Sequence, residues 1–164
     1  MATRTTAAKK SLPRAKPQDA ITLLRADHAA VGALFAEFAK ARSSARKKAL
    51  VATICTELSV HAQVEEELFY PAVKAALKDK ALIPEAVVEQ ATMKALIAQV
   101  EGIEPDGEMY DAKVTVLAEY VKHHVKEEHT EMFPRAKKTK LDMAALGAQL
   151  AQRKAELLAA KGQR

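Results

Sequence analysis

Apolar residues recur at intervals of three and four along most of the chain, which is the spacing of one face of an α-helix. In the segment 19–41 this pattern runs through Ile21, Leu24, Val31 and Phe38. The same spacing predicts further helices over 45–70, 84–101, 108–133 and 141–160. We expect the last of these to cap the others or to form a self-association surface.

Prolines and glycines divide these segments. Pro71 predicts a kink or an end at the close of the second helix, and Pro134 does the same for the fourth. Pro84 suits the first turn of the third helix. The loop before the fourth helix is marked by Gly102, Pro105 and Gly107.

The chain contains an internal repeat. His61, Glu65 and Pro71 overlay His124, Glu128 and Pro134 when the sequence is shifted by 63 residues. The preceding helices also correspond, since the pair Asp27-His28 overlays Glu89-Gln90 at a shift of 62. Neither helical hairpin can bury its apolar face alone, so the two are expected to pack together. The predicted fold is an all-α, up-down antiparallel four-helix bundle of two HxxxE-bearing hairpins, with a C-terminal fifth helix.

Composition agrees with this fold. The 164 residues are 49% apolar but only 4% aromatic, with no Trp and 5 Gly, so Ala, Leu, Val and Ile must build the core.

We expect a basic disordered tail at 1–18, a single bundle domain at 19–136 and an amphipathic helix at 137–164. Cys55 is the single cysteine and no apolar run is long enough for a bilayer, so a cytoplasmic protein without membrane contact is predicted.

The net charge of +5 arises in the N-terminal tail. Residues 1–18 carry five basic and no acidic side chains, and the basic and acidic residues of the remaining chain cancel. The tail therefore predicts at most weak, salt-sensitive nucleic-acid contacts. Its composition also leaves an organellar transit peptide as an alternative to a plain disordered tail.

The repeat carries candidate metal chemistry. Residues four apart share a helix face, so His61 with Glu65, and His124 with Glu128, each direct an imidazole and a carboxylate the same way. Both pairs lie on apolar faces, and burying unpaired carboxylates is costly unless a cation compensates them. Mixed nitrogen and carboxylate ligands suit iron or manganese better than calcium.

These elements, with their endings LFYP and MFP and the Asp-His pair of the first helix, resemble hemerythrin-like HHE domains over residues 19–136. The resemblance implies a carboxylate-bridged di-iron centre used for oxygen binding or sensing, iron handling, or nitrogen-oxide or peroxide chemistry. It implies His28, His61 and His124 as terminal ligands, and Glu65 and Glu128 as bridges.

The sequence departs from this pattern at Gln90, where both the family and the repeat predict a histidine. Three outcomes stay open: a metal pair with Gln90 or water as a weaker ligand, a labile second metal, or a mononuclear centre. Neighbouring Glu89 is a candidate substitute, but it lies about 100° round the helix from Gln90. The same geometry places His123 and His129 on the surface, and Tyr70 reaches the metal only if its helix bends near Pro71.

The leading functional hypothesis is a non-catalytic iron protein that binds or senses O2, NO or the iron supply. The alternative is an enzyme that turns over peroxide or nitrogen oxides at an open coordination position. A third hypothesis is a structural or interaction bundle that has lost its metal. Each imidazole considered singly is also compatible with a core or surface role, and the repeat favours the metal site.

Overall fold

The computed structural model describes residues 18–162, and every regular element in this part of the chain is helical. Residues 1–17 of the predicted basic tail at 1–18 lie outside the described residues. The elements are α1 (Ala20–Lys40), α2 (Ser44–Val64), η1 (Glu65–Phe69), α3 (Tyr70–Leu77), α4 (Leu82–Ala98), α5 (Glu108–Glu127), η2 (Glu128–Met132), α6 (Phe133–Lys137) and α7 (Met143–Gly162). None of these helices combines the length and apolar character that a membrane crossing requires.

Local residues set the N-terminal ends of three of the helices. Asp19 caps α1 by accepting a hydrogen bond from the backbone of Thr22 at 2.9 Å, and Ser43 caps α2 in the same way. Gly107 precedes α5 with a φ of 98°, which glycine adopts without strain. These positions fix where α1, α2 and α5 begin.

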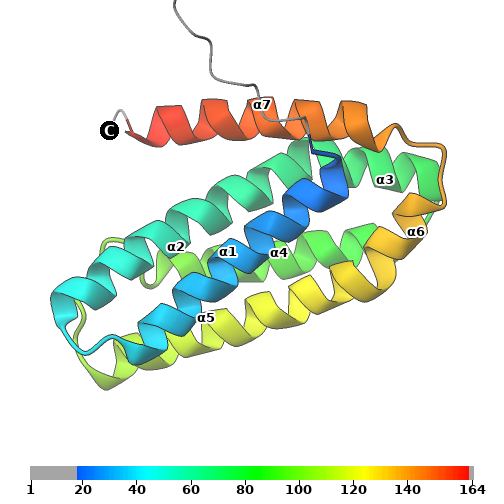
Figure 1. Cartoon of the computed structure of the whole chain (residues 1–164). Coiled ribbons are helices and arrows are strands. Elements are labelled where there is room, and N and C mark those ends of the chain that lie inside the picture. Colours follow the sequence, from blue (N-terminus) through cyan, green and yellow to red (C-terminus); the bar gives the residue numbers. More distant parts are fainter. Residues whose placement is uncertain (1–17, 163–164) are drawn as a thin grey trace, which may run out of the picture.

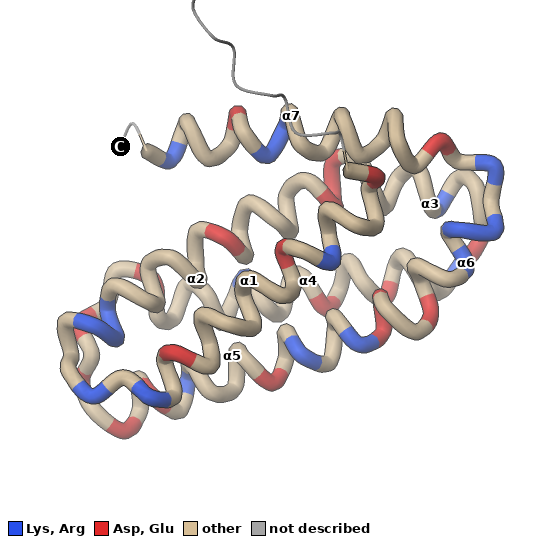
Figure 2. The backbone as a smooth tube through the Cα atoms, in the orientation of Figure 1, with Lys and Arg blue, Asp and Glu red and all other residues tan. Residues whose placement is uncertain are grey.

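The four long helices α1, α2, α4 and α5 form the bundle, as Figure 1 shows. The helix α7 lies outside it and packs along α1 and α2. Figure 2 shows acidic and basic residues interspersed along the described bundle. The predicted all-α four-helix bundle with a fifth C-terminal helix is therefore confirmed.

Two helix ends differ from the prediction. The second and fourth helices continue past Pro71 and Pro134, as α3 and α6. Before each proline the helix widens into a π-turn, in which the N–H of Tyr70 donates to the carbonyl of Glu65 and that of Phe133 to Glu128. A proline cannot donate the regular helical hydrogen bond, and the wider turn accommodates it without ending the helix.

The apolar core consists of two clusters separated by a polar layer. The cluster near α7 contains Leu24, Phe69 and Phe133, and the cluster at the far end contains Ile54 and Leu117, each with further neighbours. Between them lie the buried polar side chains Asp27, His61, Glu65, Gln90, His124 and Glu128. This layer contains the repeat residues that the sequence singles out.

Candidate metal centre

Each long helix, or the π-turn that follows it, contributes to the polar layer. The residues are His28 on α1, His61 on α2, Glu65 in η1, Gln90 on α4, His124 on α5 and Glu128 in η2. The structure therefore brings all six sequence-predicted residues into one interior site. Four of them, His28, His61, Glu65 and Glu128, offer ligand atoms that all lie within 4.8 Å of one another.

The three imidazoles direct the same nitrogen inward. Nε2 of His28 lies 3.1 Å from Nε2 of His61 and 3.0 Å from Oε2 of Glu128. Nε2 of His124 lies 3.1 Å from Oε1 of Glu128, while Nε2 of His61 contacts Oε1 of Glu65. Such crowding of nitrogen and oxygen lone pairs is typical of ligands around a cation.

The outward nitrogen of each imidazole has its own partner. Nδ1 of His61 donates to Asp27 at 3.1 Å, and Nδ1 of His124 donates to Glu89 at 2.6 Å. Nδ1 of His28 lies 2.8 Å from Nε2 of His129. At His61 and His124 the carboxylate that accepts from Nδ1 fixes the ring and its tautomer and leaves Nε2 available, which is how metal-binding histidines are usually oriented; at His28 the imidazole of His129 fixes the ring alone.

The two carboxylates are the least compensated groups of the site. Glu65 and Glu128 are almost completely buried. Among the described residues, neither oxygen of Glu65 nor Oε2 of Glu128 has a hydrogen-bond partner of suitable geometry. Unpartnered buried carboxylates cost several kcal/mol, roughly, unless a cation neutralises them. The donor set therefore fits a metal ion.

Protonation of this pair follows from its surroundings. Burial, and then the charge of Glu128, raises the pKa of Glu65 to about 7. Burial also opposes ionisation of Glu128, but close polar contacts with Glu65, His124 and His28 outweigh it and hold the pKa of Glu128 well below its usual value. Without a metal, Glu128 therefore stays ionised, whereas Glu65 keeps its proton to a higher pH than a free glutamate does.

The histidines respond to these carboxylates. Burial disfavours the charged form of His61, but the Glu65 charge and the hydrogen bond to Asp27 raise its pKa to about 10. Burial likewise opposes protonation of His124, and Glu128 more than offsets it, so its pKa rises to about 9. At His28 burial prevails and lowers the pKa. A metal ion at the site would therefore displace protons.

Tyr70 enters the site beside Gln90. Its hydroxyl donates to Oε1 of Glu128 at 2.7 Å, lies 3.1 Å from Nε2 of His124 and accepts from Nε2 of Gln90 at 3.0 Å. The required bend near Pro71 is present as the π-turn η1. The fully buried Gln90 leaves its Oε1 without a partner among residues 18–162.

The expected surface position of His129 is wrong. This side chain is half-buried, contacts His28 and accepts a hydrogen bond from Arg25 at 3.3 Å. His123 is exposed as expected, and it lies 3.2 Å from Glu127 and 3.5 Å from Glu89. Glu89 does not replace Gln90 in the interior, because it faces the outer nitrogen of His124.

Sequence reasoning missed the partners of the imidazoles, although the repeat contains the signal. Asp27 and Glu89 are equivalent acids in the two halves, and they hold the equivalent rings His61 and His124. An acid at both repeat positions predicts this pairing. His129 has no such repeat counterpart, since Glu66 stands at the equivalent position.

A pocket of about 280 Å³ connects the surface between α1 and α5 to His28. Its lining is mostly small and apolar, and includes Gly32, Phe35, Val121 and Val125. The pocket is large enough for a diatomic or triatomic ligand, and Lys122 and His28 are its polar side chains.

Comparisons with known proteins agree with the helical-bundle fold. A family model described as the hemerythrin HHE cation binding domain matches residues 19–136. The chain resembles the crystal structure of a hemerythrin HHE cation binding domain-containing protein from Mycobacterium kansasii, with a TM-score of 0.73, 24% identity and coverage of 85% of this chain and 87% of that one. It is also 31% identical over 111 residues to a DNA nickase of Nostoc sp., but the match covers 68% of this chain and 31% of that protein.

Proposed function

Because the chain belongs to the hemerythrin HHE cation-binding domain family, we propose that it binds non-haem iron in the interior site. His28, His61 and His124 would supply nitrogen donors, and Glu65 and Glu128 would bridge. The observation that carries the proposal is the arrangement of the three imidazoles: every Nε2 faces a buried carboxylate, and every Nδ1 contacts an outer partner. Mixed imidazole and carboxylate donors suit iron.

The two halves of the site differ in their donors, which supports two irons of unequal retention. His28, His61, Glu65 and Glu128 form a complete group for one metal. The other position has His124 and Glu128 together with Tyr70 and Gln90, whose oxygens are weaker or protonated donors. We therefore expect the iron beside His124 to be released first.

The bound iron would supply a redox-active centre at which a small ligand such as O2 or NO can bind. The pocket that reaches His28 supports a small ligand, since it is lined mainly by apolar side chains and contains only Lys122 and His28 as polar groups. We propose ligand binding or sensing as the function, in the reducing environment of the cytoplasm.

Tyr70 supports a second candidate, turnover of peroxide. Its phenolic O–H is buried, and burial together with the neighbouring charge of Glu65 raises its pKa well above the usual value, so it keeps its proton. The hydroxyl donates to Glu128 and accepts from Gln90, so both neighbours hold its O–H in the site. Peroxide disproportionation needs positioned proton donors, and Tyr70 supplies a fixed O–H that can donate a hydrogen bond to peroxide.

Metal analysis and optical spectroscopy of the full chain, produced with supplemented iron, test the proposal. We expect close to two equivalents of iron, loss of iron in His61→Ala and Glu128→Ala, and no loss in the surface control His123→Ala. Substoichiometric metal in the unmodified protein would support a structural bundle instead. O2 or NO binding without peroxide turnover above that of free iron would select the binding function over the enzyme.

A further inference from the structure

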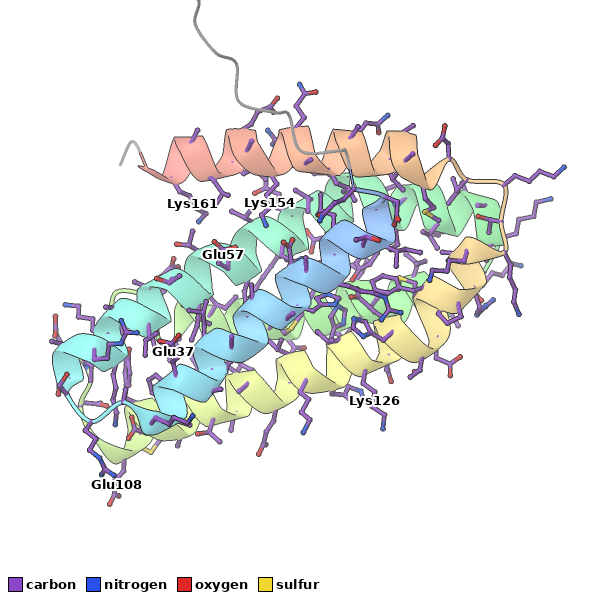
Figure 3. All side chains as sticks on the ribbon, in the orientation of Figure 1. Glu37, Glu57, Glu108, Lys126, Lys154 and Lys161 are labelled. Carbon is purple, nitrogen blue, oxygen red and sulfur yellow. The ribbon has the colours of Figure 1, made fainter. Side chains whose placement is uncertain are left out.

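The fifth helix reaches the metal site through one ion pair. Nζ of Lys154, on α7, lies 2.5 Å from Oδ1 of Asp27, and the other oxygen of that carboxylate accepts the hydrogen bond from Nδ1 of His61. Figure 3 shows Lys154 on the side of α7 that faces the bundle. Asp27 is 7% exposed, so both of its oxygens are committed to these two partners.

The position of Lys154 is set by contacts elsewhere on α7. Leu146 and Leu150 of this helix are buried in the apolar cluster that also contains Phe69 and Phe133. Arg153 donates to both oxygens of Glu67, at 2.7 and 3.1 Å, and so fastens α7 to the π-turn that begins at Glu65. These contacts hold α7 against the bundle independently of Lys154. The ion pair between Lys154 and Asp27 is therefore not needed to place the helix.

The second half of the repeat has a different arrangement. Glu89, the counterpart of Asp27, holds Nδ1 of His124 through Oε2, while its Oε1 faces the exposed imidazole of His123 at 3.5 Å. The helix α7 packs on α1 and α2 and supports the first half. The two halves of the repeat therefore differ in one respect: the Asp27 carboxylate is held by α7, whereas the Glu89 carboxylate faces the surface.

We propose that α7 is a working part of the metal site, in which Lys154 is a positioning residue that holds Asp27 against His61. An aspartate fixed at one oxygen keeps the other aimed at Nδ1, and this directs Nε2 of His61 inward. The inference rests on the proposed iron site, and it concerns a helix beyond the matched residues 19–136. Outer partners of ligating histidines typically change metal affinity by roughly 10- to 100-fold.

Iron release into a chelator tests the consequence. From full-length protein loaded with ferrous iron, we expect Lys154→Met to lose iron about tenfold faster, at the lower end of that range because Lys154 acts through Asp27. Lys154→Arg should restore retention, and Lys161→Met, two turns further along α7, should match the unmodified protein. Equal release from Lys154→Met and the unmodified protein would overturn the inference while leaving the iron site intact.

The metal-free protein gives an independent readout. By NMR, the Nδ1 proton of His61 should exchange with solvent about tenfold faster in Lys154→Met, because the loosened Asp27 holds this proton less firmly. The factor is the one expected for iron release. The Nδ1 proton of His124, held by Glu89, is the control within the same molecule and should not change. Unchanged exchange at His61, or equal acceleration at both rings, would refute a positioning role. This measurement remains decisive even if the unmodified protein retains no iron.

Discussion

Replacing Glu65 with glutamine should stabilise the metal-free protein above neutral pH and weaken its hold on metal. The protonated carboxyl of Glu65 lies beside the charged Glu128 in the buried site. Glutamine has nearly the same shape, stays neutral at every pH and can donate to Glu128 through its amide nitrogen. It therefore imitates the protonated state of Glu65 that the metal-free fold favours.

The magnitude follows from the pKa of Glu65, which burial and the charge of Glu128 raise from 4.5 to about 7. Below pH 4.5 the carboxyl is protonated in both the folded and the unfolded chain, and its ionisation costs no stability. Between pH 4.5 and 7 the unfolded chain loses the proton first, so stability falls as the pH rises. Each pKa unit is worth about 1.4 kcal/mol, which gives a total loss of about 3 kcal/mol above pH 7.

Urea unfolding of chelator-treated protein measures this difference. The free energy of unfolding of Glu65→Gln, relative to the unmodified protein, should increase by about 2 to 3 kcal/mol between pH 5 and pH 8. The surface control Glu131→Gln should show no such trend. A difference that is independent of pH would show that Glu65 ionises normally in the fold, and the reasoning about an uncompensated carboxylate pair would be refuted.

Three further predictions concern Gln90, Tyr70 and Gly147. Gln90→His adds the nitrogen donor that the repeat lacks and should raise the iron retained after dialysis; no gain would show that this position does not limit the site. Tyr70→Phe removes the partner of Gln90 and Glu128 and should lower the free energy of unfolding of the metal-free protein by about 1–3 kcal/mol in denaturant titration, whereas an unchanged value would contradict these hydrogen bonds. Gly147→Ala places a Cβ 2.2 Å from the carbonyl oxygen of Gln18, so the substitution should displace α7. We expect the fold to lose about 1–3 kcal/mol of stability in a thermal melt and to release iron faster, and an unchanged melting temperature would contradict this close packing.

The sequence predicts the bundle and the central residues because helical spacing and the internal repeat both depend on residue positions alone. His61 and Glu65 are four apart, and this spacing places them together in any α-helix. Packing of two equivalent hairpins then brings the second pair to the first. No contact with a distant part of the chain is needed for that argument.

The role of Tyr70 depends on a local departure from α-helical geometry. Five residues after Glu65, a regular α-helix would turn it about 140° away from that carboxylate. The π-turn takes up an extra residue, and the phenol instead reaches Glu128 and His124. Pro71 signals a disturbance of the helix but does not specify whether the helix ends, bends or widens.

The contribution of α7 is not predictable from spacing, because its contact with Asp27 joins residues 127 positions apart. Its amphipathic pattern indicates only that one face is buried. Which ion pair forms depends on where the helix crosses α1, and Gly147 permits that close approach.

The polar layer also separates the apolar core into two clusters, which we expect to behave as two unfolding units. Leu24 and Phe133 belong to one apolar cluster, and Ile54 and Leu117 belong to the other. Regions joined by few apolar contacts tend to open separately, and this is visible as distinct tiers of amide hydrogen exchange. In the metal-free protein the two ends should therefore exchange with different free energies of opening, and a bound cation that links all four long helices should merge them into a single unfolding unit.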